Sequence, residues 1–171
     1  MASRKYITQL ANSIIGKSAT APIKIDKIIK DQGLKLVPYE EDGVSGILMV
    51  EKSSATIGYA TNEPRERQRF TKAHELGHFL LHRGGNLFID KKSMSMYRPS
   101  NGAPSNDWQE WEANEFAACI LMPEHLVREE MKNIQIDYAD DESGNTWIKK
   151  LADIFEVSVS AMSIRISKLG L

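Results

Sequence analysis

Residues 67–82 read R-Q-R-F-T-K-A-H-E-L-G-H-F-L-L-H and place two histidines and a glutamate within five consecutive positions. Pro64 suits the start of a helix, so we expect one helix over about residues 65–82. On that helix His74 and His78 share a face, with Cβ atoms roughly 6 Å apart. Both rings can then bind one ion, so the spacing predicts a metal site that prefers zinc, with Mn²⁺ as another possible divalent ion.

The glutamate of this segment predicts a catalytic role. Glu75 is rotated about 100° from His74, too far to be the natural third ligand but suitable for reaching a metal-bound water. We therefore interpret Glu75 as a general base. A catalytic zinc also needs a third protein ligand. His82 is a poor candidate, because it lies about 12 Å from His74 along a continuous helix, and we interpret it as a structural or supporting residue.

A second acid-rich segment, E-W-E-A-N-E-F over residues 110–116, offers the missing ligand. Glu110 and Asn114 are four apart and share a helix face, whereas Glu112 is rotated about 200° from Glu110. We predict Glu110 as the carboxylate ligand, with Glu112 as its rival. Asn114 is expected to accept a hydrogen bond from a ligating imidazole and so fix its tautomer. The interpretation that Glu110 is only a solvated acid stays open.

The rest of the chain predicts a helix-rich α+β fold. β-prone runs bounded by turn residues indicate a small, mostly antiparallel sheet of residues 34–39, 46–51 and 55–60. Helical spacing of apolar residues indicates helices over about residues 1–18, 25–30, 65–82, 108–121, 147–156 and 158–169. Residues 83–109 are rich in Gly, Ser, Asn and Pro and are expected to form a long functional loop.

Composition favours an ordinary globular protein without strong charge bias. The 171 residues hold 22 basic and 23 acidic side chains, a balance that gives no reason to expect nucleic-acid binding. The single Cys119 cannot form an internal disulfide, which fits a reducing, cytoplasmic setting. No apolar run approaches the length of about 20 residues that a membrane helix needs.

Residues 67–82, together with E-W-E-A-N-E-F-A-A-C-I-L-M-P at residues 110–123, resemble the ImmA/IrrE family of metallo-endopeptidases. The likeness implies a zincin-like metallopeptidase core over residues 1–136. The acidic stretch at residues 137–142 is typical of a linker, and the two closing helices have helix-turn-helix proportions. We therefore expect residues 137–171 to form a C-terminal helix-turn-helix-like extension, packed on the core as one structural unit. In that family the residues matching His74, His78 and Glu110 hold zinc, and the residue matching Glu75 is catalytic.

The same resemblance implies a function. Compact members of the family inactivate a helix-turn-helix (XRE-type) repressor of a prophage, mobile element or toxin–antitoxin-like module by proteolysis. Hydrolysis would use a metal-bound water, with Glu75 as general base. Tyr97 and His125 are candidates for stabilising the oxyanion, although each is more typical of a surface residue.

An alternative reading is a DNA-binding or metal-sensing regulator that acts through its C-terminal helices without proteolysis. The closing helices carry few net positive charges, and acids precede them at residues 137–142. We therefore do not expect direct binding of nucleic acid. The sequence carries no signal for the oligomeric state.

Overall fold

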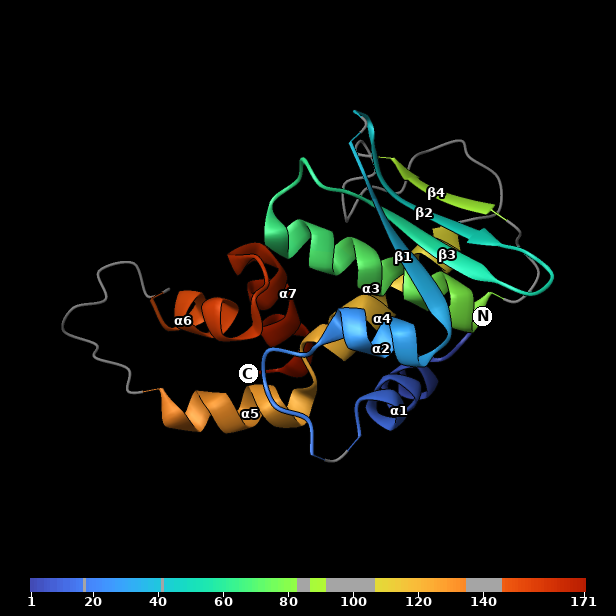
Figure 1. Ribbon diagram of the computed structural model, residues 1–171. Helices are drawn as coiled ribbons and strands as arrows, with labels where there is room; N and C mark the ends of the chain where they lie inside the picture. The colour runs from blue at the N-terminus through green and yellow to red at the C-terminus, as the bar shows by residue number, and fades with distance from the viewer. Residues whose placement is uncertain (17, 41, 83–86, 92–106, 135–145) are drawn as a thin grey trace.

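The computed structural model describes residues 1–16, 18–40, 42–82, 87–91, 107–134 and 146–171 (Figure 1). The fold is helix-rich α+β, which confirms the predicted class. Within the described ranges, no helix combines the length and apolar composition needed to cross a membrane. The helices are α1 Arg4–Ile15, α2 Ile25–Asp31, α3 Arg65–Leu81, α4 Asp107–Leu121, α5 Glu124–Asn133, α6 Thr146–Phe155 and α7 Val159–Leu169.

Among the described residues, the sheet has four strands in the order β1-β3-β2-β4. Strand β2 runs antiparallel to both β3 and β4, but β1 pairs with β3 in parallel. The most buried of the first three strands, β3, takes a central position, whereas the more exposed β1 lies at an edge. An edge suits β1 because Pro38 has no N–H to donate to a further strand. The strands are β1 Leu34–Tyr39, β2 Val44–Val50, β3 Ala55–Ala60 and β4 Leu87–Lys91.

Two elements differ from the sequence prediction. Strand β4 lies inside residues 83–109, which were expected to be loop throughout. The sequence pattern does not predict helix α5, because Pro123 indicates only the end of the preceding helix. Pro123 also stands at the N-cap of α5. The backbone nitrogen at this position takes no part in the helical hydrogen bonds, so the missing N–H of proline costs nothing there. The chain therefore turns at this proline and continues as a second helix.

Helix α3 occupies the centre of the fold. It packs against strands β2 and β3 on one side and against α4 on another (Figure 1). Every residue from Phe70 to His78 is buried. At Gly77 the helices approach so closely that an added Cβ would lie 3.1 Å from the Cα atom of Ala113. This glycine therefore sets the short distance between α3 and α4.

The last helix, α7, has the predicted caps and is tied to α4 and to the residue that follows α4. Ser158 caps α7 by accepting a hydrogen bond from the Ala161 backbone N–H, and Gly170 ends it in the left-handed conformation. Arg165 Nε donates to the Met122 carbonyl at 3.0 Å, and Lys168 Nζ lies 2.7 Å from a carboxylate oxygen of Glu115. The proposed boundary between residues 136 and 137 lies outside the described residues, so the division into core and extension stays a prediction.

Candidate metal centre

Three potential ligands from α3 and α4 converge on one point. His74 Nε2 lies 3.2 Å from one carboxylate oxygen of Glu110, and His78 Nε2 lies 3.3 Å from the other. The two Nε2 atoms are 3.0 Å apart. Ligand atoms of all three residues fall within 4.8 Å of one another. The histidines are buried, while Glu110 keeps 27 % of its side chain exposed, so the cluster lies at the edge of the core.

The polar contacts of His74 fit a metal ligand. Its second ring nitrogen, Nδ1, lies 3.0 Å from Oδ1 of Asn114 on α4. Because an amide oxygen only accepts, His74 Nδ1 donates, and in the neutral ring the Nε2 lone pair is then available to a cation. The donor set of two imidazole nitrogens and one carboxylate oxygen is one that zinc prefers, and it leaves a fourth position for water or substrate. The residues present therefore fit a catalytic zinc ion.

Electrostatics favour the metal-binding forms of two ligands. Burial lowers the pKa of His78, and this outweighs the opposing hydrogen bond with Glu110. Burial raises the pKa of Glu110, but hydrogen bonds with His74 and His78 outweigh that effect, so its pKa falls well below the usual range. Near neutral pH the imidazole of His78 is neutral and the Glu110 carboxyl is ionised. The Glu110 carboxylate can then donate an electron pair directly, and the neutral imidazole can donate one from the ring nitrogen that carries no proton.

The side chain of Glu75, a residue of helix α3, lies against strand β2. Its side chain is fully buried. A Cβ atom placed on Gly46 of β2 would lie 2.7 Å from Glu75 Oε1 and 2.5 Å from Cγ2 of Thr71. Only a residue without a side chain fits at this position of the strand. The carboxylate of the H-E-L-G-H motif is therefore held against the sheet.

The family comparison agrees with this geometry. A model of the M78 peptidases, described as the IrrE N-terminal-like domain, matches residues 30–167. The chain belongs to this peptidase family. The match covers more than half of the chain and confirms the resemblance found in the sequence. Comparison with curated proteins gave no match.

In this peptidase, Gly46→Ala is expected to lower the free energy of unfolding by about 1–3 kcal/mol, the usual cost of overpacking. The new methyl group would collide with Thr71 Cγ2, which is stiff because Thr is β-branched. Urea unfolding followed by circular dichroism measures the loss. Adding Thr71→Ser removes Cγ2 and should restore part of the stability. Equal urea midpoints for Gly46→Ala and the wild type would contradict this packing.

Two polar residues of the peptidase have contacts that the sequence did not predict. Glu112, considered only as a rival to Glu110, is buried and lies 3.0 Å from His82 Nε2 through its Oε2. His82 Nδ1 in turn lies 3.0 Å from His78 Nδ1. The four-residue spacing of His78 and His82 was the sequence signal that could have predicted the contact between their rings.

Of the oxyanion candidates, His125 is exposed on α5, and Tyr97 lies outside the described residues.

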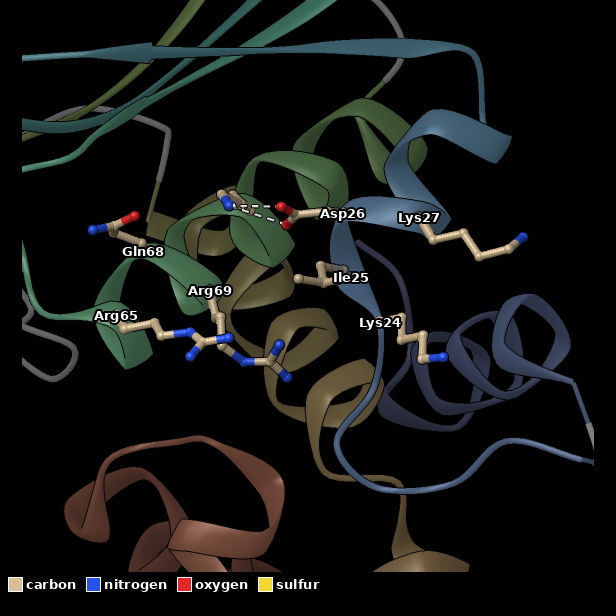
Figure 2. A pocket seen from close by; sticks show the side chains of 8 residues that line it. Lys24, Ile25, Asp26, Lys27, Arg65, Gln68 and Arg69 are labelled. Carbon is tan, nitrogen blue, oxygen red and sulfur yellow. Dashed lines mark hydrogen bonds and ion pairs between the residues drawn. The ribbon is translucent and has the colours of Figure 1, made fainter.

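A cavity of about 210 Å³, lined mostly by basic side chains, lies on a different face of α3 (Figure 2). Lys72, one of its lining residues, is rotated about 200° from His74 around the helix. Lys72 Nζ lies 3.0 Å from both carboxylate oxygens of Asp26. Dashed lines at Asp26 mark these contacts in Figure 2. Arg69 donates to the Glu156 carbonyl at 3.1 Å. These charges connect α2 and the turn after α6 to α3, so we interpret this cluster as structural.

Proposed function

We propose that this peptidase is a zinc-dependent endopeptidase in which His74, His78 and Glu110 hold the metal. The observation that carries the proposal is the convergence of their ligand atoms within 4.8 Å. Glu75, the residue after His74 on the same helix, is buried. Zinc is preferred because two nitrogens and one oxygen form a typical zinc donor set. Mn²⁺ is the other divalent ion that we consider.

The chemistry divides between the metal and Glu75. When bound, zinc would supply Lewis acidity that makes a water nucleophilic near neutral pH and polarises the scissile carbonyl. Glu75 would take the proton from the attacking water and deliver it to the leaving amine. Asn114 would hold the ring of His74 in the tautomer that presents Nε2. Water attacks directly, so we expect no covalent acyl-enzyme.

We further propose that the substrate is a helix-turn-helix repressor encoded by the same prophage, mobile element or toxin–antitoxin-like module. This class of substrate rests on the likeness of the two sequence motifs to the ImmA/IrrE peptidases. The contacts of helix α7 argue against DNA binding as the activity. Arg165 and Lys168 of α7 are used in internal contacts with Met122 and Glu115. Fewer cations on this helix are then available to phosphate groups.

Incubation with the repressor-like product of a neighbouring gene tests this function. The zinc-loaded protein should convert the repressor into discrete fragments, seen by gel electrophoresis and located by mass spectrometry. A chelator should stop the reaction, and added zinc should restore it. Cleavage that continues at the same rate in chelator would refute metal dependence. An intact repressor in the presence of active enzyme, as judged on a peptide library, would refute this substrate class alone.

A further inference from the structure

A line of buried polar contacts leads away from the metal cluster through His78. His78 Nδ1 lies 3.0 Å from His82 Nδ1, and His82 Nε2 lies 3.0 Å from Glu112 Oε2. The other oxygen of Glu112 accepts a hydrogen bond from the Ala2 backbone N–H. The side chains of His82 and Glu112 are each only 1 % exposed. We propose that Glu112 and His82 are positioning residues that hold His78 in its metal-binding tautomer, an inference that rests on the zinc site proposed above.

The direction of the contacts follows from what each group can donate. An ionised carboxylate only accepts, so His82 Nε2 donates to Glu112. A neutral His82 then has no proton on Nδ1, and this nitrogen accepts a hydrogen bond from His78 Nδ1. With zinc bound, His78 then carries its proton on Nδ1 and presents its lone pair from Nε2, the nitrogen on the Glu110 side. The reverse assignment would put a proton on Nε2, where the metal would bind.

The two ligating imidazoles are thus oriented by different partners from one helix. Asn114 contacts His74 directly, whereas Glu112 reaches His78 through His82. Glu112 is rotated about 200° from Glu110 on α4, so the ligand and the positioning acid leave opposite sides of the helix. A buried carboxylate is costly without hydrogen-bond donors. Glu112 obtains them from the His82 ring and the Ala2 backbone.

Substitution of Glu112 separates this role from simple packing. Glu112→Met removes the acceptor for His82 and is expected to lower zinc affinity by about 10- to 100-fold, the usual effect of losing a supporting partner. Glu112→Gln keeps a carbonyl acceptor and should restore most of the affinity. Glu115→Met is the matched control, because Glu115 is buried on the same helix but pairs with Arg4 and Lys168. It should bind zinc as the wild type does. Competition with a chromophoric chelator measures all four proteins.

The tautomer itself provides a readout that a packing role would not change. In the zinc-loaded wild type, the Nδ1–H of His78 should give a downfield, slowly exchanging ¹H–¹⁵N signal, because it is held in a hydrogen bond to His82 Nδ1. His82→Phe, which removes the acceptor, should shift this signal upfield and speed its exchange with water. An unchanged signal in His82→Phe, or equal zinc affinity of Glu112→Met and the wild type, would overturn the inference while leaving the zinc site intact. A wild type that takes up no zinc would instead refute the proposed function.

Discussion

Glu75→Gln is expected to slow peptide cleavage by about 10²- to 10⁴-fold, the range that general acid–base catalysis contributes. Glutamine has nearly the same shape and fits the same space between α3 and Gly46 of β2, but its amide cannot accept a proton from water. Zinc content should equal that of the wild type because the three proposed ligands are unchanged. Turnover of the cut substrate and metal analysis of the same sample measure the two effects.

The control for this result is a buried acid on α4. Glu115 pairs with Arg4 and Lys168, away from the histidines, so Glu115→Gln should retain activity. Loss of activity in both variants would indicate a general response to removing buried charge. Full turnover by Glu75→Gln would refute the assignment of Glu75 as the base.

Glu110→Ala should abolish stable zinc binding. Its carboxylate faces both imidazoles, at 3.2 Å from His74 and 3.3 Å from His78, so its removal takes away both a ligand and the negative charge of the site. The loss of affinity should exceed the about 10- to 100-fold cost of disturbing a supporting partner. Zinc retained after dialysis gives the first measure of this change.

Thermal unfolding gives the second measure for Glu110→Ala. Zinc at about 100 times its dissociation constant should stabilise the wild type by about 2.7 kcal/mol. The melting temperature of Glu110→Ala should not respond to that concentration. Glu124→Ala removes a more exposed acid on α5 that pairs with Arg128, and its zinc response should match the wild type. An equal zinc-dependent rise in Glu110→Ala would exclude Glu110 as a ligand.

Local patterns were sufficient to predict most helices and the three residues that the structure brings together at the candidate metal centre. Helical caps such as Ser158 and Gly170 act within a few residues, so the sequence alone shows them. The choice between Glu110 and Glu112 also depended on local geometry, because one helix places them about 200° apart. The structure brings Glu110 to the histidines and Glu112 to His82.

Long-range pairing could not be predicted in the same way. Strand β1 pairs in parallel with β3. This pairing depends on which strand is best buried on both faces, and that burial is a property of the assembled sheet, not of a single strand. Strand β4 has only five residues, and its pairing with β2 joins distant parts of the chain. The contact between Glu112 and the Ala2 backbone spans 110 residues. Neither neighbouring residues nor periodicity carry a signal for contacts of this kind.

The complete burial of residues 70–78 in α3 has a consequence for how this sequence can diverge. In an amphipathic helix such as α6, exposed positions including Lys149 and Asp153 can drift without affecting the core. Helix α3 offers no such position over these nine residues, which span about two and a half turns. Amino-acid replacements should therefore accumulate slowly during evolution at every one of these positions, including those with no chemical role, because each side chain is packed in the core. Counting identities among relatives would therefore make all nine residues look functional, although the proposed chemistry uses only His74, Glu75 and His78.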